Sequence, residues 1–375
     1  MPNVSLIIPT RNESETICEC IERSLQTFKD MADMGLSGEV LVVDSSGDGT
    51  ADIAASCGAR VIRPGKLGYG NAYLAGFQQA VGDYFVLMDG DLTYDPAAMR
   101  DMIALLLSGN YDMVMGSRLK GNILPGAMPA LHRYIGNPVL TGMLNWLFSS
   151  SISDTHCGMR AISKKALEKL SLRSGGMEFA SEMLIEAVCK GLRIAEVPIT
   201  YYPRRGSSKL HSFTDGWRHV RFMMLYRPVP FLLVPGFIVL IFGLALFVSV
   251  YMEGGLRMHS LILGGLLAII GYQIFLAGLH FEAFGASYGL SHPGRIKKMI
   301  SYHSLEKELF IGIILVIAGV LLGLDVLMNW GSSGFGALDA ASSAMMAMIL
   351  SILGIQTVFS GMFISLLLLN NGQQD

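Results

Sequence analysis

The sequence predicts an α/β domain with a mostly parallel sheet, followed by an all-α membrane domain of four transmembrane helices. The first prediction rests on short apolar runs that alternate with helix-like segments, a pattern typical of parallel sheets. The second rests on four later apolar stretches, each near the roughly 20 residues that cross a bilayer. Charge agrees with this division, because only five of the 28 Lys and Arg residues lie beyond Pro228. The net charge of −2 gives no reason to expect a nucleic-acid partner.

Five apolar runs near the N-terminus supply the predicted strands. The runs are residues 4–8, 39–44, 60–62, 84–88 and 112–115. The predicted helices that follow them are residues 15–34, a segment from Thr50 onward, residues 71–81 and residues 96–107. In sheets of this kind ligands bind beyond the carboxyl ends of the strands, so the residues directly after each run are the candidates for a site.

The four predicted spans divide the chain into domains. The spans are residues 229–252, 258–281, 308–330 and 340–369, approximately. They leave a soluble domain, 1–212, a connecting segment, 213–228, and a membrane domain, 229–375. Aromatic and arginine residues in the connecting segment suit a helix at the membrane interface, with an ordinary connector as the alternative.

Basic residues decide the predicted orientation of the spans. Four of them lie between the second and third spans, whereas the two other loops hold only Arg257. By the positive-inside tendency, we expect a multi-pass protein of the cell membrane, or of an endoplasmic-reticulum-type membrane, with its soluble domain in the cytoplasm.

The cysteines support the same compartment. All five lie in the predicted soluble domain, at Cys18, Cys20, Cys57, Cys157 and Cys189. Their odd number and their lack of metal-binding spacing lead us to expect reduced thiols in the cytoplasm. The N-terminal residues also lack the basic start and apolar core of a signal peptide, so we expect the first domain to remain unexported.

Acidic residues follow three of the predicted strands. Glu13 lies after the first run, Asp44 ends the second, and Asp89 and Asp91 follow the fourth. Because parallel strands bring their carboxyl ends to one edge of a sheet, we expect these side chains to lie close together. Two hard oxygen ligands at a strand exit can hold a divalent cation against a diphosphate. A solvated turn is the alternative for the Asp-Gly-Asp triplet.

Glycine-rich segments give weaker information. The sequence has no GxxxxGK[ST] segment, so a P-loop is not expected. A looser glycine-rich segment, 65–70, lacks the dinucleotide fingerprint, and either a ligand contact or a flexible turn explains it.

Seven motifs occur in one order along the predicted soluble domain. They are Pro9-Thr10-Arg11-Asn12-Glu13, Val43-Asp44 with Asp48-Gly49-Thr50, Gly68-Tyr69-Gly70-Asn71-Ala72, Asp89-Gly90-Asp91, Gly116-Ser117-Arg118, Asp154-Thr155-His156-Cys157-Gly158-Met159-Arg160 and Gly206-Ser207-Ser208-Lys209-Leu210. In this combination the chain resembles the family 2 glycosyltransferases of GT-A fold. Within them it resembles the polyprenyl-phosphate glycosyltransferases, the dolichol-phosphate mannose and glucose synthases, some of which also have a tail of paired membrane helices.

Two positions depart from the pattern of that family, and a third segment favours one of its groups. Asp44-Ser45 stands where an Asp-Asp pair is usual, so one contact to the nucleotide differs from the family pattern. Leu92-Thr93 stands where the mannose synthases often have Leu-Gln, so the third protein ligand of the metal differs from the family pattern. The Asp-Thr-x-Cys-Gly sequence at 154–158 looks closer to the glucose-type synthases.

The resemblance also implies roles for individual residues. The residues implied in binding the nucleotide sugar are Pro9, Glu13, Asp44, Asp89, Gly90, Asp91, Arg204 and Lys209. Asp89 and Asp91 would hold Mg²⁺ or Mn²⁺. Arg118 and Arg133 would receive the acceptor phosphate, a task for which guanidinium geometry is suited. For Arg204 and Lys209, a solvated or lipid-facing basic loop is the alternative.

By this resemblance we expect an inverting enzyme that moves one hexose, glucose or mannose, from a UDP- or GDP-sugar to a polyprenyl or dolichyl phosphate at the bilayer. Asp91, Arg118 and Asp154 form the expected catalytic set, with Asp154 as a base or an orienting group and Glu182 as a second candidate carboxylate. The apolar segment 121–150 either docks on the bilayer or packs in the core. The oligomeric state stays open.

Two other functions are weighed against this one. A processive polysaccharide synthase is disfavoured because no Gln-x-x-Arg-Trp element follows the soluble domain. A non-catalytic membrane assembly partner is disfavoured because Asp89, Asp91, Arg118 and Lys209 are all present.

Overall fold

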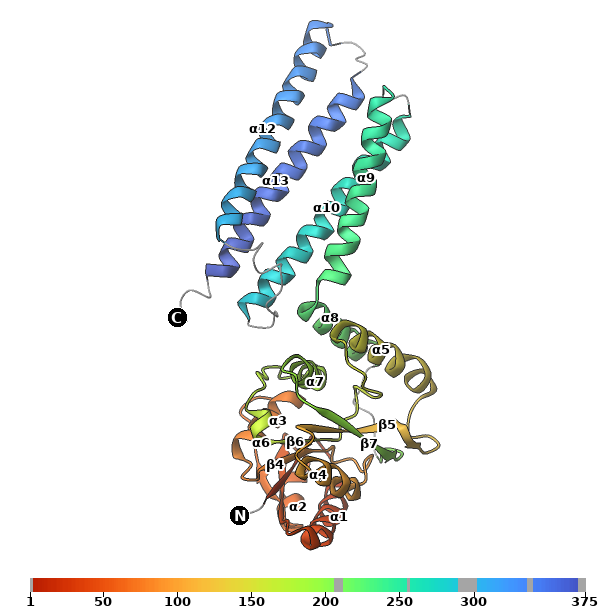
Figure 1. Ribbon diagram of the computed structural model, residues 1–375, viewed down its shortest axis with the longest axis vertical. Helices are drawn as coiled ribbons and strands as arrows, with labels where there is room; N and C mark the ends of the chain where they lie inside the picture. The colour runs from red at the N-terminus through yellow and green to blue at the C-terminus, as the bar shows by residue number, and fades with distance from the viewer. Residues whose placement is uncertain (1–2, 206–211, 255–256, 289–301, 336–339, 370–375) are drawn as a thin grey trace. The chain divides into compact units, whose positions relative to one another are not determined.

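The computed structural model describes residues 3–205, 212–254, 257–288, 302–335 and 340–369 (Figure 1). The chain divides into two units, Met1–Phe222 and Met223–Asp375. The first is an α/β unit and the second is all-α, which confirms the predicted fold class. Helix α8 (Ser212–Tyr226) covers most of the predicted interface segment, and its location at a membrane stays a prediction.

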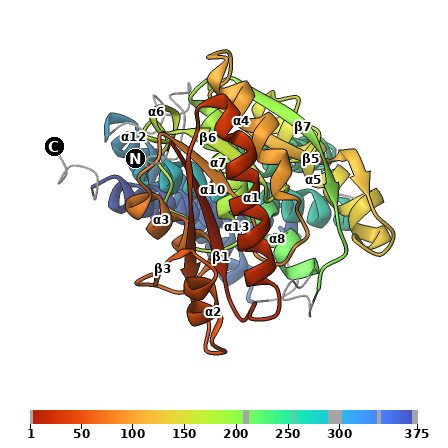
Figure 2. The same cartoon turned by 90° about the horizontal axis from the view of Figure 1, so that it is seen from below.

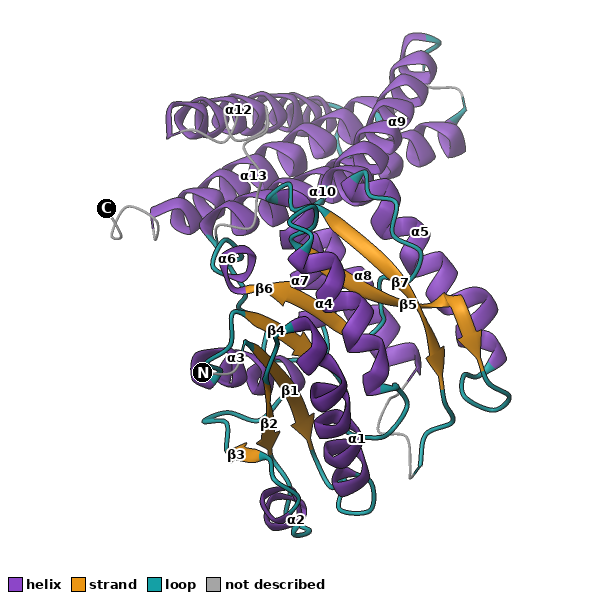
Figure 3. Cartoon of the chain, turned by 60° about the horizontal axis from the view of Figure 1, so that its bottom comes forward, coloured by secondary structure: helices purple, strands orange, loops and turns teal. Residues whose placement is uncertain are grey.

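The α/β unit contains one seven-stranded sheet (Figure 3). The strands are β1 (Val4–Thr10), β2 (Gly38–Asp44), β3 (Arg60–Ile62), β4 (Tyr84–Leu87), β5 (Met113–Ile123), β6 (Arg160–Ser163) and β7 (Ile194–Tyr201). Their order is β3-β2-β1-β4-β6-β5-β7, and all neighbours are parallel except β6, which runs antiparallel to β4 and β5. The register pairs Thr10 with Asp44 and Ile7 with Leu87. The ends of β1, β2 and β4 therefore meet at one edge.

Helices cover both faces of this sheet. The helices of this unit that precede α8 are α1 (Ile17–Asp30), α2 (Thr50–Ser56), α3 (Tyr69–Gln79), α4 (Met99–Leu107), α5 (Asn137–Phe148), α6 (Lys164–Leu167) and α7 (Phe179–Cys189), of which α5 packs on α7 rather than on the sheet. Leu6 and Ile8 of β1 belong to a core cluster with apolar residues of α1 and α4, which lie side by side in Figure 2. Ile7 points to the opposite face, where Gly76 lets α3 approach closely. The apolar run of β1 is thus buried on both faces, as expected of a central parallel strand.

Some elements differ from their predicted bounds. The first helix ends at Asp30 and continues as a 3-10 turn, Met31–Met34, rather than running through 15–34 as one helix. β5 extends to Ile123, well beyond the apolar run that predicted it, because its second half pairs with β7 after an irregularity. β6 and β7 were not predicted at all. β6 has only four residues and begins with a buried arginine, so its composition gives no apolar run.

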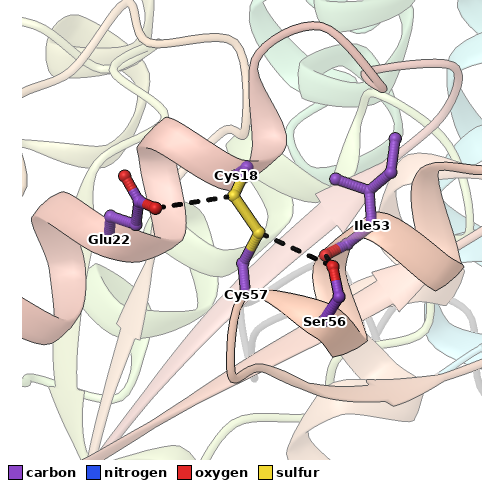
Figure 4. Close-up of a disulfide and its surroundings, with 5 residues drawn as sticks. All are labelled: Cys18, Glu22, Ile53, Ser56 and Cys57. Carbon is purple, nitrogen blue, oxygen red and sulfur yellow. Dashed lines mark hydrogen bonds between the residues drawn. A yellow bond between two sulfur atoms is a disulfide. The ribbon is translucent and has the colours of Figure 1, made fainter.

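The prediction of five reduced thiols is wrong for two of the cysteines. Cys18 in α1 and Cys57 at the end of α2 form a disulfide with their Cα atoms 5.6 Å apart (Figure 4). That separation lies within the range that a disulfide can bridge. Cys20, Cys157 and Cys189 take no part in a disulfide. Spacing along the chain did not reveal the pair, because the two residues are 39 positions apart and meet only when α1 packs against α2.

The second unit contains four helices that are long and apolar enough to cross a membrane. They are α9 (Val234–Met252), α10 (Met258–Ser287), α12 (Tyr302–Ser332) and α13 (Ala341–Leu369), and a short π-helical turn, Val229–Leu233, precedes α9. α9 packs on α10, α12 packs on α13, and α10 contacts α13. The four predicted spans are therefore present, arranged as two helical hairpins.

Small residues and hydroxyl groups join these helices. A Cβ atom on Gly271 would lie 2.2 Å from the backbone nitrogen of Leu240, so only glycine permits the close approach of α10 to α9. Between α10 and α13, the hydroxyl groups of Tyr272 and Thr357 are 2.6 Å apart. Small residues at contacts and hydrogen bonds across them are what hold apolar helices together in lipid.

Candidate active site

The loops after β1 and β2 form the first side of the site. The Thr10 hydroxyl donates a 2.7 Å hydrogen bond to Asp44, whose carboxylate also accepts from the Ser46 backbone nitrogen at 3.1 Å. Asp44 is only 2% exposed. Pro9 is a half-buried residue inside β1, paired with Val43. The structure thus places Pro9 and Asp44 at the predicted edge, with the carboxylate of Asp44 already held by neighbouring groups.

The same two loops are joined to one another by backbone donors. Asn12 N donates to the Ser46 hydroxyl at 2.7 Å, and Glu13 N donates to the Thr50 hydroxyl at 3.1 Å. Asn12 has a φ of 53°, a left-handed conformation that asparagine tolerates better than most residues. Asp48 accepts from Thr50, which lowers the pKa of Asp48 to about 2. The loops therefore form one continuous rim beside the strand ends.

Asp89 and Asp91 follow β4 directly, at the centre of this edge. Asp91 is 5% exposed, and the backbone nitrogen and hydroxyl of Thr93 both donate to its Oδ1, at 3.1 and 2.6 Å. Tyr69 OH lies 3.4 Å from Asp89 Oδ1. Leu92 has a φ of 62°, a strained conformation of the kind found at functional sites. Burial, and next the charge of Asp91, raise the pKa of Asp89 to about 7.

Close packing fixes the position of this acidic turn. A Cβ atom on Gly90 would lie 3.1 Å from the side chain of Ile8 and 3.2 Å from that of Thr10, so a larger residue would require these side chains to shift by a few tenths of an ångström. Thr93, which stands at the position implied for a third metal ligand, uses its hydroxyl to orient Asp91. Sequence reasoning did not identify this task for Thr93, or the contact of Tyr69 with Asp89.

Arg204 reaches this edge from the segment after β7. Its guanidinium lies 3.1 Å from Glu13 and 3.3 Å from Asp91. It therefore joins two of the acidic residues that were predicted to bind the nucleotide sugar, and its charge lowers the pKa of Asp89. Lys209, which was predicted to act with Arg204, lies outside the described residues.

A buried ion pair forms the second side of the site. Arg118 Nε and Nη2 donate to the two carboxylate oxygens of Asp154 at 2.7 and 2.8 Å, and the Arg118 backbone nitrogen donates to Asp154 at 3.1 Å. Arg118 is 7% exposed and Asp154 is 0% exposed. The guanidinium carbon also lies 5.2 Å from the centre of the Tyr201 ring. Both oxygens of Asp154 are thus occupied in orienting Arg118.

Arg133 is placed differently from Arg118. It lies in a π-helical turn, His132–Gly136, and its guanidinium stacks at 5.4 Å on the ring of Tyr134. Among the residues that the structure describes, no contact joins it to the Arg118–Asp154 pair. If Arg133 also binds the acceptor phosphate, as predicted, it must do so without direct contact with Arg118 or Asp154.

Glu182 serves a loop rather than the acidic edge. It is 1% exposed in α7, and it accepts hydrogen bonds from the backbone nitrogens of Arg173 and Ser174 at 3.1 and 2.8 Å. Burial raises its pKa. The carbonyl oxygens just beyond, at Gly175 and Gly176, accept from the first backbone nitrogens of α3. Glu182 therefore supports the glycine-rich turn at the start of α3.

That arrangement narrows the interpretation of the glycine-rich segment. Asn71 N donates to Gly175 O at 3.1 Å and Gly70 N to Gly176 O at 3.2 Å, so these donors are used within the protein. Gly68 has a φ of 135°, and a Cβ atom there would lie 2.2 Å from Gly175 O. The glycines fit a close approach of two segments rather than a phosphate cradle.

Arg160 is a further residue that the sequence did not single out for a role. Its side chain is 1% exposed, and it donates to the carbonyl oxygens of Thr155 and Cys157 at 3.1 and 2.9 Å, and to that of Ala180. It thereby holds the segment after Asp154 against α7. In the sequence, only its position at the end of the 154–160 motif marks Arg160. Nothing in the sequence indicates which carbonyl oxygens it contacts.

The donor set at the acidic edge fits a divalent cation held by two protein ligands. Asp89 and Asp91 offer hard carboxylate oxygens, and the repulsion between them is relieved when a cation binds. Within the described ranges no group of three acidic, His or Cys side chains converges.

Comparison with known proteins identifies the family. The family model Glycosyl transferase family 2 matches residues 5–171, and the Glycosyltransferase family 2 C-terminal transmembrane region matches residues 279–368. The chain is 41% identical over 367 residues to the low-salt glycan biosynthesis hexosyltransferase Agl6 of Haloferax volcanii, which covers 96% of this chain and 87% of that protein.

Shorter matches involve proteins named for dolichol substrates. A dolichyl-phosphate hexose transferase of H. volcanii is 36% identical over 180 residues, covering 48% of this chain and 76% of its own. A dolichol-phosphate mannosyltransferase of Pyrococcus furiosus is 33% identical over 235 residues, covering 60% and 64%. A solved structure, glucosyl-3-phosphoglycerate synthase of Mycobacterium tuberculosis with Mn²⁺, UDP and product, is 22% identical, covers 60% and 79%, and has a TM-score of 0.48. The chain therefore belongs to glycosyltransferase family 2, as a membrane glycosyltransferase related to dolichyl-phosphate hexose transferases.

Proposed function

We propose that this protein transfers one hexose from a UDP- or GDP-hexose to a polyprenyl or dolichyl phosphate, with inversion at the anomeric carbon. The observation that carries the proposal is the convergence of two buried features in one α/β unit. These are the carboxylates at the strand ends, a buried Asp91 beside a half-buried Asp89, and the buried Arg118 guanidinium held by Asp154. The first suits a nucleotide diphosphate with its metal, and the second suits a phosphate acceptor. The printed names of the relatives support hexose and dolichyl phosphate as partners.

The donor would lie along the edge formed by β1, β2 and β4. In this proposal Glu13 and Asp44, which lie at that edge, contact the base and ribose, while Asp89 and Asp91 hold Mg²⁺ or Mn²⁺. When bound, the cation would neutralise charge that develops on the departing nucleoside diphosphate. Arg204 pairs with Glu13 and Asp91, and in this proposal it moves onto the diphosphate once the donor enters.

The acceptor phosphate needs orientation more than it needs a base. A phosphate monoester has a second pKa of about 6, so it is mostly ionised at neutral pH. One of its oxygens attacks the anomeric carbon as the bond from that carbon to the diphosphate breaks on the opposite face. Arg118 supplies the guanidinium that orients this phosphate, and Asp154 fixes Arg118. We therefore propose Asp154 as an orienting group.

Metal affinity is expected to depend on pH through Asp89. Its pKa of about 7 means that the carboxyl is protonated below pH 7, and a protonated carboxyl is a poor ligand. Mn²⁺ affinity should rise about fivefold between pH 6 and pH 7 and level off above pH 8, because one proton competes with the metal. Titration of Mn²⁺ by electron paramagnetic resonance at several pH values measures this. Equal affinity from pH 5.5 to 8 would show that Asp89 is not a ligand.

The lipid acceptor would approach along α5. Leu131, Ile135, Val139 and Trp146 recur at helical spacing along one stripe, and each is 57–68% exposed. An exposed apolar stripe of this kind suits docking on a bilayer. We propose that α5 and α8 both lie at the interface, on the cytoplasmic face of the cell membrane or of an endoplasmic-reticulum-type membrane.

Polar substitutions in this stripe are expected to weaken use of the lipid acceptor only. Combining Val139→Ser and Trp146→Ser should raise the KM for a long-chain polyprenyl phosphate in vesicles about five- to twentyfold, because apolar area no longer enters the bilayer. Transfer to a water-soluble short-chain prenyl phosphate should be unchanged, which serves as the control. If the KM rises equally for both acceptors, the stripe has a folding role instead.

The proposed function is tested with purified full-length protein in detergent. The assay supplies Mn²⁺ or Mg²⁺, a polyprenyl phosphate and, one at a time, radiolabelled UDP- and GDP-hexoses, and it scores label in the lipid fraction. Label from a single donor would support the proposal and name the sugar. Folded protein that binds metal and nucleotide, yet transfers no label from any donor, would favour a non-catalytic partner.

A further inference from the structure

The disulfide between Cys18 and Cys57 lies beside the proposed nucleotide loops. Cys18 is the second residue of α1, which begins just after the loop that carries Glu13. Cys57 is the residue that ends α2, which begins just after the loop of Asp44. Figure 4 shows the bond crossing from one helix to the other, with Glu22 and Ser56 close to the two sulfur atoms.

The disulfide and the loop contacts hold α2 at both of its ends. At the beginning of α2, the Thr50 hydroxyl accepts from Glu13 N at 3.1 Å, and Asp48 accepts from Ser14 N at 3.4 Å. At its last turn, the disulfide ties it to α1. α2 has only seven residues, so movement of one end is passed to the other.

The hydrogen bonds alone form a weak connection. Asn12 N to Ser46 and Gly47 N to Asn12, at 2.7 and 3.3 Å, join exposed groups for which water competes. Between these two loop-and-helix segments, the disulfide is the covalent link within the described part of the chain. Breaking it leaves the exposed part of the rim, at Asn12, Ser46 and Gly47, to hydrogen bonds that are individually marginal.

The exposure of the two cysteines and the proposed cytoplasmic location both favour a disulfide that forms and breaks reversibly. Cys18 and Cys57 are half-buried near the surface, whereas the free thiols of Cys20 and Cys157 are 1% and 0% exposed. A reductant can therefore reach this pair. In a cytoplasmic domain, as proposed above, a disulfide is usually transient and redox-sensing rather than structural.

We propose that Cys18 and Cys57 are a thiol–disulfide exchange site that sets the affinity of the nucleotide pocket. The proposal rests on the proposed function, because it regulates the same nucleotide site. The co-reactant is a dithiol reductant. One of its thiolates attacks a sulfur of the pair to form a mixed disulfide, and its second thiol then releases the protein. Two electrons and two protons pass to Cys18 and Cys57, which become thiols, while the reductant leaves as a disulfide.

The test compares two redox states of the full-length protein in detergent. Titration with UDP and with GDP in Mn²⁺ gives Kd for protein treated with oxidised glutathione and for protein treated with dithiothreitol, while alkylation and mass spectrometry count free thiols. We expect three free thiols in the oxidised state and five in the reduced state. Nucleotide Kd should rise about three- to tenfold on reduction and return on reoxidation, because ordering of the rim is lost.

Variants distinguish reduction of the Cys18–Cys57 disulfide from other effects of the reductant. The double variant Cys18→Ser with Cys57→Ser should bind nucleotide with the weaker affinity in both treatments. The matched control, Cys189→Ser, removes a half-buried thiol elsewhere and should respond to reductant as the parent does. Equal Kd in the two redox states, or five free thiols after oxidation, would overturn the proposal.

A second readout keeps this result apart from failure of the proposed function. Amide hydrogen exchange of residues 44–57 should become faster on reduction, and it needs no nucleotide. If neither nucleotide binds in either state, the proposed function fails, and unchanged exchange in that case refutes the exchange site as well. If nucleotide binds and only the redox response is missing, the proposed function stands and this inference falls.

Discussion

Replacing Asp91 with asparagine is expected to lower hexose transfer by about a thousandfold or more while the α/β unit stays folded. Asparagine keeps the shape of the side chain and can still accept from Thr93, which holds Asp91 at 3.1 and 2.6 Å. It removes the charge that would hold the metal and balance Arg204. Charge stabilisation by a bound metal is worth several kcal/mol, and about 1.4 kcal/mol corresponds to each tenfold in rate.

The measurement is the rate of label transfer to polyprenyl phosphate, with Mn²⁺ affinity and thermal unfolding alongside. Asp83→Asn is the matched control, because Asp83 is an exposed acidic residue before the other end of β4. That control should keep its full rate. Asp91→Asn with near-parent activity would remove the acidic edge from the mechanism.

Asp154→Asn is expected to give the second largest effect, on stability as well as on activity. It leaves the guanidinium of Arg118 buried without its counter-charge, and loss of one partner of a buried pair costs about 3–5 kcal/mol. Transfer should fall about a hundred- to a thousandfold, because Arg118 no longer has a fixed orientation toward the acceptor phosphate. Chemical denaturation and steady-state kinetics measure the two effects.

Kinetics also separate an orienting role from a base. If Asp154 orients Arg118, the KM for the acceptor rises, the pH profile keeps its shape, and Arg118→Lys gives the same kinetic pattern, since lysine cannot make the bidentate contact. A base would instead show a fall in kcat with unchanged acceptor KM, and loss of the acidic limb of the pH profile. The second pattern would contradict the role that we assign to Asp154.

The sequence predicted the acidic edge well because local rules govern it. Apolar runs that end in Asp44 or precede Asp89 mark strand ends, and parallel pairing then brings those ends together, as the register of Thr10 with Asp44 shows. The apolar helices of the second unit were predicted for a similar reason, since length and composition are enough.

Contacts between segments that are distant in the chain could not be predicted from the sequence. Arg118 and Asp154 are 36 positions apart, and nothing in either motif shows that one neutralises the other. β6 carries too few apolar residues to be recognised as a strand from the sequence. Its place in the sheet depends on antiparallel pairing with both β4 and β5, which are distant in the chain. Glu182 was an expected carboxylate of the site, yet the packing of α7 turns it toward backbone nitrogens.

The measurement that tests the central claim most directly is the mass spectrum of the lipid product. Full-length protein is incubated with Mn²⁺, its nucleotide sugar and a polyprenyl phosphate of a single chain length. We predict one product with the mass of that polyprenyl phosphate plus one hexose residue, and none when polyprenol replaces the phosphate. A ladder of several hexoses would indicate a processive synthase, and a polyprenyl diphosphate sugar would indicate transfer of a sugar phosphate, and either would contradict the account.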